Sequence, residues 1–548
     1  MYRQVLDPIV HSLGWSALFA ALPLLVLFVL LGVLRITAWI SSLVALAVAL
    51  IVATVVYPMP AGQALLAGSL GATFGLFPIL WIVINAIWIY NMTVQTGDFD
   101  VLRRSFSRVS ADQRIQAVII AFCFGALIEA LAGFGAPVAI TAVMLLALGF
   151  APLRAATVAL VANTAPVAFG ALATPITTLS TVTGLPLHDL GSTVGRQTPV
   201  LAVFVPLALV FIVDGARGLR QAWFPALSCG VVFAIAQFVT SNYISVPLTD
   251  VVASLASAGA VVLLLRVWQP REAVLGPVMA PVAGGAVDEQ EPGFAGRVRH
   301  PDSPAAELRA YVPYLVIIVI FVIAQLHWVA VQLGKVTRSF SWPGLHIQNA
   351  AGKVSTVSVF RFNWLTAAGT LMLIAGLVTV ALLRLSPGQA VRAYGRTLHQ
   401  LRWAIITVMA VLALAFVMNA SGQTATLGTW MAGAGAAFAV LSPILGWLGV
   451  AVTGSDTSSN SLFGALQVTA ATKADLSTTL MAASNSSGGV LGKMVSPQNL
   501  AIAAGVVGLA GREGDIFRRV IGWSLLFLAG MCVLVYLQST AVLGWMLP

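Results

Sequence analysis

The sequence predicts an all-α polytopic membrane protein with about 12–14 transmembrane helices and two inverted repeats that contain re-entrant hairpins or broken helices. Three observations predict this fold: the composition, long apolar blocks, and two matching stretches interrupted by glycine. Of the 548 residues, 59% are hydrophobic and only 8% are charged, whereas soluble domains are about 25% charged. A water-facing protein is therefore excluded.

The apolar residues form uninterrupted blocks, for example residues 18–34, 43–57, 200–213 and 365–383. Several of these blocks approach the roughly 20 residues that a helix needs to cross the hydrocarbon core. Because backbone polar groups in lipid must be hydrogen-bonded internally, spanning segments are helices or strands of a closed barrel. A barrel needs alternating rather than continuous hydrophobicity, so the blocks predict helices.

Four regions follow one another along the chain. Residues 1–95 are expected to form N-terminal scaffold helices, the first of them retained because its apolar run is too long for a signal peptide. Residues 96–215 contain the first repeat, residues 216–400 are connecting scaffold helices, and residues 401–548 contain the second repeat. Within the connecting region, residues 269–308 are rich in Pro, Gly and charge, which is typical of a flexible cytoplasmic linker.

The formal net charge of +10 comes from basic residues in short loops between apolar blocks. These loops are residues 103–114, 214–220, 266–309, 384–402 and 512–519. By the positive-inside rule they lie in the cytoplasm, which puts both termini and the loop at 335–361 outside. The same pattern argues against a nucleic-acid partner, which net charge alone would suggest.

Two distant stretches repeat one another. The first reads GFGAP at residues 133–137 and NTAPVAFGALATPI at 163–176, and the second reads TGSDTSSN at 453–460 and NSSGGVLGKMVSPQN at 485–499. In both, an Asn is followed by Gly seven positions on and by Pro five positions later. Upstream, helix ends are expected at Gly97 and Gly422 on opposite sides of the membrane. An inverted repeat of this kind is typical of secondary transporters with a binding site at the midplane.

Each copy carries one interrupted segment. Residues 124–141 are apolar but contain Gly133, Gly135 and Pro137, and residues 455–461 are seven consecutive polar residues between apolar flanks. Unwound backbone at membrane depth persists only where protein buries it or where it lines an aqueous cavity. We expect a re-entrant hairpin or a broken helix, with a continuous helix that uses glycine for close packing as the alternative.

Ionisable residues inside the membrane are costly and are functional candidates by default. We assign proton coupling to Glu129 and Asp456. For Glu129 we favour a proton carrier, because burial disfavours a charged carboxyl group; the alternative is a fixed charge partner for Lys493 or Arg196. For Asp456 a structural hydrogen-bonding role and a coupling-ion role both stay open, and its oxygen-rich surroundings would also suit sodium.

Lys493 is expected to pair with a substrate carboxylate, or alternatively to extend to the membrane interface. Neutral donors and free backbone amides at half-helix N-termini would complete an anion site. The other candidate substrate-binding residues are Gly133, Phe134, Gly135, Ala136, Asn163, Thr164, Ser455, Thr457, Ser458, Asn485, Ser486, Ser487, Ser496 and Gln498.

These runs also carry a family resemblance over nearly the whole chain. GFGAPVAIT, NTAPVAFGA, VGRQ at 194–197, GWLGVAVTGSDTSSN and GGVLGKMVSPQ resemble signature segments of the bacterial L-lactate and glycolate permease family. The resemblance implies proton-coupled uptake of L-lactate, D-lactate or glycolate across the bacterial inner membrane. It further implies elevator-type motion of residues 124–180 and 446–508 against a scaffold that could also form a homodimer. Rocking about a fixed site is the conservative alternative.

Other classes of function are weighed against this one. A sodium-coupled carboxylate carrier stays open, as does a channel-like or energy-transducing membrane subunit. An enzyme is not expected, because no nucleophile is accompanied by a His base and no cofactor motif is present. Neither a metal nor a cofactor is expected beyond the proton as coupling ion, since the cysteines Cys123, Cys229 and Cys532 lack metal-site spacing.

Overall fold

The computed structural model describes residues 2–34, 36–107, 109–110, 112–131, 133, 135–270, 272, 274, 303–350, 352, 358–509 and 512–548. In this part, ten helices are long and apolar enough to cross a membrane, which confirms the polytopic helical fold. The expected 12–14 crossings do not correspond one to one with these helices. The helical stretch Leu187–Ile244 has 58 residues, more than twice what one crossing needs, and it is interrupted several times.

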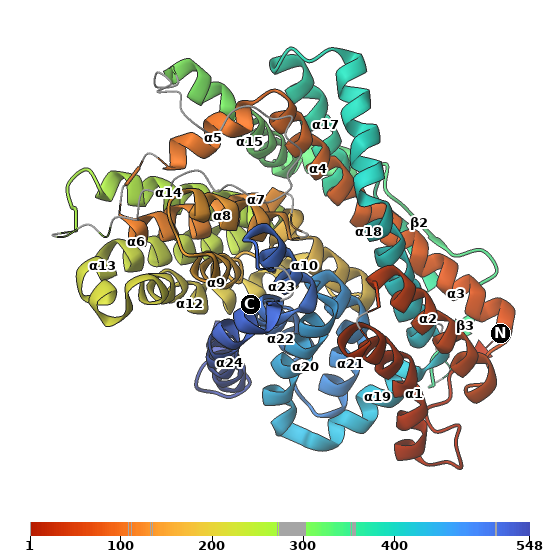
Figure 1. Cartoon of the computed structure of the whole chain (residues 1–548). Coiled ribbons are helices and arrows are strands. Elements are labelled where there is room, and N and C mark those ends of the chain that lie inside the picture. Colours follow the sequence, from red (N-terminus) through yellow and green to blue (C-terminus); the bar gives the residue numbers. More distant parts are fainter. Residues whose placement is uncertain are drawn as a thin grey trace.

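The helices before the first interrupted segment are α1 (Leu13–Phe28), η1 (Val29–Val33), α2 (Ala38–Ile51), η2 (Val52–Val56), α3 (Ala61–Phe74), η3 (Gly75–Leu80), α4 (Trp81–Gln95) and α5 (Asp98–Ser107). α2 and α3 pack against the long helix α18 (Pro387–Ser421), far along the chain (Figure 1). A Cβ atom at Gly71 of α3 would lie 2.4 Å from the carbonyl oxygen of Leu412. Glycine therefore allows this close helix contact.

The first interrupted segment is a hairpin, which we call hairpin 1. One arm is α6 (Gln113–Gln116), η4 (Ala117–Phe124) and α7 (Gly125–Leu131), and the other is α8 (Ala136–Ala147). The side chain of Gln113 donates to the carbonyl of Leu148 at 3.3 Å, so the arms run antiparallel. Gly133 (φ 48°) and Gly135 (φ 84°) form the turn, in a region that favours glycine. The predicted interruption is confirmed; Phe134 lies outside the described residues.

The second interrupted segment is also a hairpin, which we call hairpin 2. Its arms are α20 (Phe438–Thr453) and α21 (Asp456–Lys473), and Gly454 at the turn has φ 75°. The Ser442 hydroxyl donates to the Gln467 side-chain oxygen at 2.7 Å, which joins the two arms. The turn of hairpin 2 therefore interrupts the helical structure where the run of seven polar residues begins.

The segment after each hairpin is also broken, but at a different point of the shared Asn–Gly–Pro spacing. After hairpin 1, α9 (Pro152–Ala162) ends before Asn163 and α10 (Gly170–Thr183) follows. After hairpin 2, α22 (Thr478–Gly492) continues through Asn485 and breaks only at η9 (Lys493–Val495), before α23 (Pro497–Val506). Pro166 explains the earlier break, because its ring would clash with the carbonyl of Ala162 in a continuous helix.

The remaining helices surround these elements. They are α11 (Leu187–Val194), α12 (Thr198–Ala202), α13 (Val205–Val239), η5 (Thr240–Ile244), η6 (Val246–Leu248), α14 (Thr249–Leu264), α15 (Pro304–Gln325), α16 (His327–Gly334), α17 (Ala368–Leu382), α19 (Gln423–Met431), η8 (Ala432–Ala437), α24 (Glu513–Gln538) and η10 (Gly544–Met546). Asp214 and Gly215 kink α13. Figure 1 shows α10, α22 and α23 at the centre, between hairpin 1 with α13 and α14 on one side and α1–α4 with α18 on the other.

The short strands lie with the N-terminus, on the side predicted to be external. β1 (Tyr2–Arg3) pairs in parallel with β3 (Ile347–Gln348), and β2 (Arg338–Ser341) pairs antiparallel with β4 (Val359–Phe362). The Tyr2 hydroxyl donates to the carbonyl of Ser421 at 2.8 Å. The N-terminus, the loop around the strands and the end of α18 therefore lie together.

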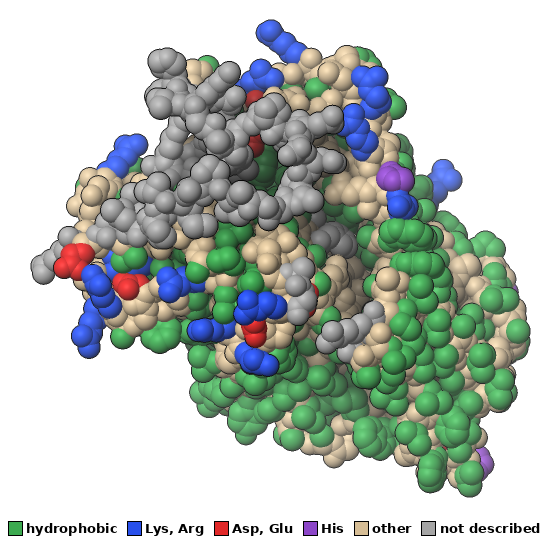
Figure 2. Space-filling view, in the orientation of Figure 1, with side chains coloured by type: hydrophobic (Ala, Val, Ile, Leu, Met, Phe, Trp, Pro, Cys, Tyr) green, Lys and Arg blue, Asp and Glu red, His purple; other side chains and the backbone are tan. Residues whose placement is uncertain are grey.

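Three of the loops predicted to be cytoplasmic form a second group. Arg114 forms an ion pair with Asp214 at 3.1 Å and donates to the carbonyl of Glu272 at 2.6 Å. Asp98, just after the end of α4, pairs with Arg309 at 3.3 Å. The ends of α4 and α18 thus belong to different groups, which agrees with the predicted topology. Figure 2 shows a broad hydrophobic surface over α1, α2 and α19, as expected of a face toward lipid.

Candidate functional site

Glu129 and Lys493 form a buried ion pair between hairpin 1 and the break after α22. The Lys493 Nζ lies 2.6 Å from the Glu129 Oε1, and the side chains of Lys493 and Glu129 are 7% and 4% exposed, respectively. Lys493 therefore does not extend to an interface. A buried charge is tolerated when it is paired and hydrogen-bonded, so each of these side chains accounts for the presence of the other.

The rest of the Glu129 carboxylate is held by the first repeat. Asn163, directly after α9, donates its Nδ2 to the Glu129 Oε2 at 3.0 Å. A Cβ atom at Gly170 would lie 2.7 Å from Glu129 Oε1, so glycine is required where α10 begins. The Oδ1 of Asn163 is buried without a hydrogen-bond partner among the described groups. An acceptor is therefore free beside the ion pair.

The backbone next to this pair is strained. Ala171, Leu172 and Ala173 have φ values of 42°, 55° and 57°, a left-handed turn that costs non-glycine residues roughly 1–2 kcal/mol each. Such strain persists only where the surrounding structure imposes it, and it gathers at functional sites.

The turns of both hairpins meet at the start of α23. A Cβ atom at Gly135 would lie 2.5 Å from the Ile502 side chain, and one at Gly454 would lie 2.6 Å from Gln498 Oε1. Ser496 is the N-cap of α23, and its hydroxyl accepts from the backbone amide of Asn499 at 3.4 Å. The N-terminus of α23, which favours negative charge, therefore lies between the two turns.

Asp456 follows the turn of hairpin 2 and is held by neutral donors. Its Oδ2 accepts from Ser486 at 2.5 Å and from Asn460 at 3.4 Å, while its Oδ1 is buried without a partner among the described groups. Lys493 interacts with it electrostatically. Asn460 also donates to the carbonyl of Pro175 in α10 at 3.1 Å. The network links hairpin 2 to both broken segments.

Three consecutive residues of α22 point in different directions. Ser486 faces Asp456, whereas the side chain of Asn485 donates to Asn460 at 2.9 Å. Ser487 donates to the Oε1 of Gln197 at 2.6 Å, and the Nε2 of Gln197 donates to Gln538 at 2.9 Å. Gln197 was not among the predicted site residues, although it lies in the VGRQ run. A buried polar residue directly after a Gly–Arg interruption could have indicated it.

The other predicted residues divide between the site and its supports. A Cβ atom added at Gly133 would lie 3.7 Å from the Glu129 Oε1, so Gly133 lies against this carboxylate. Ser455 is the N-cap of α21 and accepts from the backbone amide of Ser458 at 3.2 Å. Thr164 donates to the carbonyl of Val161 at 2.7 Å. Ala136 begins α8 and Thr457 lies in the first turn of α21.

Arg196 lies apart from the acidic residues assigned to coupling. It donates to the side chain of Asn242 at 2.9 Å and to the carbonyl of Met546 at 2.8 Å. Of the two charge partners expected for Glu129, Lys493 and Arg196, the structure therefore places Lys493 beside it. Arg196 instead lies just before α12 and forms a hydrogen bond to a residue near the C-terminus.

A further buried acid, Asp250, was missing from the prediction. It is the second residue of α14, its side chain accepts from Gln237, and it interacts electrostatically with Glu129. The sequence around it, SVPLTD, resembles a polar loop between helices. Only the packing of α14 against α7 and α13 brings this acid into the interior.

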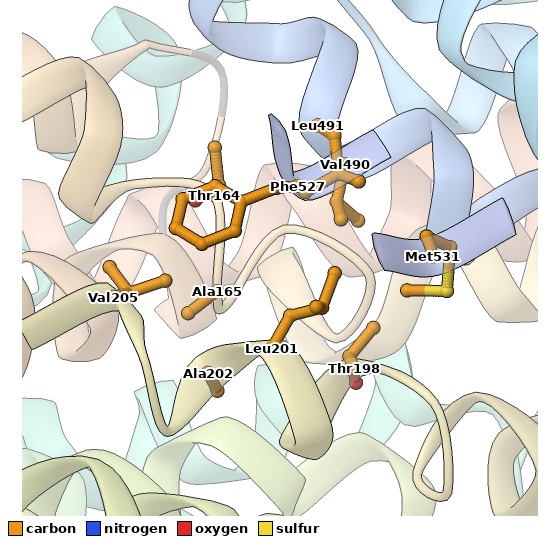
Figure 3. Close-up of a pocket in the computed structure, with 10 residues that line it drawn as sticks. All are labelled: Thr164, Ala165, Thr198, Leu201, Ala202, Val205, Val490, Leu491, Phe527 and Met531. Carbon is orange, nitrogen blue, oxygen red and sulfur yellow. The ribbon is translucent and has the colours of Figure 1, made fainter. Parts of the chain in front are cut away.

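A small cavity beside the site is unsuited to an anion. Its walls combine Thr164 and Ala165, from the break after α9, with side chains of α12, α13, α22 and α24 (Figure 3). Eight of the ten lining residues are apolar, and its volume of about 10 Å³ is close to the minimum for one water molecule. The Glu129–Lys493 pair and the two hairpin turns therefore remain the candidate binding site, closed in this conformation.

The family model and the curated relatives agree on one family. The family model described as L-lactate permease matches residues 16–542. The glycolate permease GlcA of Escherichia coli (strain K12) is 41% identical over 545 residues, with 97% of each chain covered. The L-lactate permease of the same strain is 39% identical over 561 residues, with 100% of each chain covered. Among solved structures, Neisseria gonorrhoeae MtrF, from a study of antimetabolite efflux pumps, aligns with 86% of this chain and 83% of its own, at 14% identity and a TM-score of 0.47.

Proposed function

Because the chain belongs to the L-lactate permease family, we propose that it takes up L-lactate and related 2-hydroxymonocarboxylates, namely D-lactate and glycolate, together with protons. The family resemblance expected from the sequence is confirmed. The chain is a transporter rather than an enzyme, and a multi-pass protein of the bacterial inner membrane. The substrate and the coupling ion are the parts that we propose.

The chemistry of the site supports a small hydroxy acid as substrate. Lys493 offers an ammonium group for a carboxylate, and the N-terminus of α23 adds positive potential nearby. The free Oδ1 of Asn163 can accept a hydrogen bond from the substrate hydroxyl group. Two relatives are named as a glycolate permease and an L-lactate permease. Glycolate and L-lactate each combine one carboxylate with one adjacent hydroxyl group.

The ion pair supplies the reason for coupling to protons, and this is the observation that carries the proposal. When a substrate carboxylate takes Lys493, Glu129 loses its cation, and an uncompensated buried charge costs about 3–5 kcal/mol. Protonation of Glu129 removes that cost. Since about 1.4 kcal/mol corresponds to a tenfold change in affinity, substrate and proton are expected to favour each other's binding by about 100-fold or more.

The arrangement of the two hairpins supports an inverted repeat and an elevator-type motion. The hairpin turns meet at α23, and the ends of α4 and α18 belong to groups of loops on opposite sides. We propose that residues 124–180 and 446–508 move as one unit, because Asn460 joins hairpin 2 to α10 and Lys493 joins the break after α22 to hairpin 1. Rocking of the two halves about this site is the alternative.

One observation favours sodium as the second candidate coupling ion. The Oδ1 of Asp456 is buried without a partner among the described groups, and the Ser486 hydroxyl oxygen lies against the other oxygen of the same carboxylate. Oxygen ligands of this kind suit hard cations. Sodium would then be expected at Asp456, and transport would depend on sodium at constant pH.

The test is uptake of labelled L-lactate into proteoliposomes that contain the purified protein. An inward proton gradient, a proton ionophore and sodium are varied separately. We expect accumulation that the ionophore abolishes, that sodium does not alter, and that unlabelled glycolate competes away. Uptake that depends on sodium at constant pH would identify sodium, rather than the proton, as the coupling ion. No uptake of L-lactate under any gradient, by protein shown to be folded, would contradict the substrate assignment.

A further inference from the structure

We propose that Asp250 is a second proton-binding site of this transporter, separate from Glu129 and connected through Gln237 to the break after α9. The proposal rests on the proposed proton coupling and deepens it. Asp250 and its connection were not expected from the sequence, and they use residues of α13 and α14, outside both hairpins.

The first argument is the environment of the carboxyl group. Asp250 is 0% exposed. Its Oδ1 accepts one hydrogen bond, at 2.8 Å from the Nε2 of Gln237, and its Oδ2 is buried without a partner among the described groups. A neutral amide is a weak compensation for a full charge, whose burial without a cation is very unfavourable. A protonated carboxyl group satisfies these surroundings at far lower cost.

The second argument is the count of charges at the centre of the molecule. Among the described residues, three buried acids, Glu129, Asp250 and Asp456, share one buried cation, Lys493, at this centre. Lys493 pairs directly with Glu129 and interacts electrostatically with Asp456, whereas Asp250 has the like charge of Glu129 as its neighbour. One ammonium group cannot neutralise three carboxylates. Asp250 has the least compensation of the three, so it is the acid that holds a proton in this conformation.

The ionisable groups on the elements packed against α14 do not change this count. α7 carries Glu129 and α10 carries none. η4 and α13 present the thiols of Cys123 and Cys229, whose sulfur atoms lie 3.4 Å apart beside Ser257, two turns further along α14. On η5, Tyr243 is 72% exposed. Asp214, Arg217 and Arg220 also belong to α13, but they lie toward its other end, roughly 25 Å or more along the helix from Gln237. Within the described residues, these elements therefore supply no cation to Asp250.

The third argument is the connection made by Gln237. Its Nε2 also donates to the carbonyl of Ala165 at 3.4 Å, and its Oε1 accepts from the Thr198 hydroxyl at 3.3 Å. Ala165 belongs to the break after α9, and both Ala165 and Thr198 line the cavity of Figure 3. Movement of this break during transport would change the hydrogen bonds of Gln237 and hence the stability of the Asp250 proton. The acid is thereby coupled to the moving part of the site.

Infrared spectroscopy tests the proton directly. Substrate-free protein in lipid, labelled with ¹³C at the aspartate carboxyl carbon, is expected to show the carbonyl stretch of a protonated carboxyl group shifted by the label. The band should persist in Asp456→Asn and be lost in Asp250→Asn. Absence of the shifted band from the unsubstituted protein, its persistence in Asp250→Asn, or its loss in Asp456→Asn would overturn the proposal. The measurement on the unsubstituted protein and on Asp456→Asn is informative even if Asp250→Asn does not fold.

Transport measurements separate a proton site from a structural acid. Asp250→Asn keeps an acceptor for Gln237, so L-lactate exchange at equal pH is expected to remain, while accumulation driven by a proton gradient is lost. Asp189→Asn, an exposed acid on α11, is the matched control and should change neither. Proton-driven accumulation that survives in Asp250→Asn would overturn the inference. If the unsubstituted protein shows no proton-driven accumulation, the proposed function fails instead, whatever the infrared band shows.

Discussion

Lys493 and Glu129 lie 364 residues apart in the sequence, and their side chains meet at 2.6 Å in the interior. The contact joins hairpin 1 to the break after α22, so two segments far apart in the sequence share one ion pair. Because the pair is buried, neither charge can lose its partner without a replacement. In the proposed mechanism, a substrate carboxylate replaces Glu129 as the partner of Lys493, and a proton neutralises Glu129.

We expect Lys493→Ala to abolish L-lactate binding and to lower the free energy of unfolding by about 3–5 kcal/mol, because Glu129 is left as an unpaired buried charge. The double variant Lys493→Met/Glu129→Gln should recover most of the stability but no binding. Thermal unfolding in lipid nanodiscs, with and without L-lactate, measures both effects. Lys473→Ala, at the exposed end of α21, is the control. Equal stability of Lys493→Ala and the double variant would contradict this account.

Glu129→Gln is expected to retain exchange of external for internal L-lactate and to lose accumulation driven by a proton gradient. The amide can still accept a hydrogen bond from Lys493 but cannot take up a proton as the carboxylate does. Labelled L-lactate exchange at equal pH, followed by uptake under an imposed pH gradient, distinguishes the two activities. Accumulation that survives in this variant would remove Glu129 as the proton carrier.

The crossing of α20 and α22 depends on two glycines. A Cβ atom at Gly446 would lie 1.9 Å from the carbonyl oxygen of Asn485, and one at Gly488 would lie 2.2 Å from that of Pro443. We therefore expect Gly446→Ala and Gly488→Ala each to reduce the yield of monodisperse protein in size-exclusion chromatography. Gly522→Ala, where an added Cβ atom meets nothing within 4 Å, should behave as the unsubstituted protein. A monodisperse Gly446→Ala at normal yield would show that the helices can separate without loss of the fold.

Arg114 is expected to be essential for stability. It is 0% exposed and pairs with Asp112 at 2.7 Å and Asp214 at 3.1 Å, so Arg114→Ala should cost about 3–5 kcal/mol. Arg114→Lys should not restore the loss, since an ammonium group lacks the planar fork. Arg217→Ala removes an exposed pair with Glu272 and should lower the stability far less than Arg114→Ala, because water screens exposed ion pairs. Chemical unfolding of the three variants in detergent tests the order, and an Arg114→Lys as stable as the unsubstituted protein would contradict it.

Much of the site could be predicted from local patterns. Gly133, Gly135 and Gly454 interrupt apolar runs, and each adopts a positive φ at a hairpin turn. Glu129, Asp456 and Lys493 were selected because ionisable residues in apolar segments are costly, and all three are buried at the centre. These predictions needed only hydropathy and the conformational preferences of single residues.

Other residues could not be predicted, because their roles depend on neighbours distant in the sequence. Asp250 follows a loop-like SVPLT run, and only the packing of α14 against α7 places it near Glu129. Gln197 contacts Ser487, 290 residues later. The shared Asn–Gly–Pro spacing indicated matching breaks, yet Pro166 ends α9 early while α22 stays helical against α20.

The sequence by itself determined that this protein is a polytopic helical transporter of its family and where its two hairpins turn. Hydropathy, glycine and proline act through their own backbone and the surrounding lipid, so they can be recognised without knowledge of the fold. Only the tertiary structure decided which buried charges compensate one another. Electrostatic energy in a low-dielectric interior depends on distances between side chains, and those distances arise when hairpin 1, α14 and the break after α22 pack together.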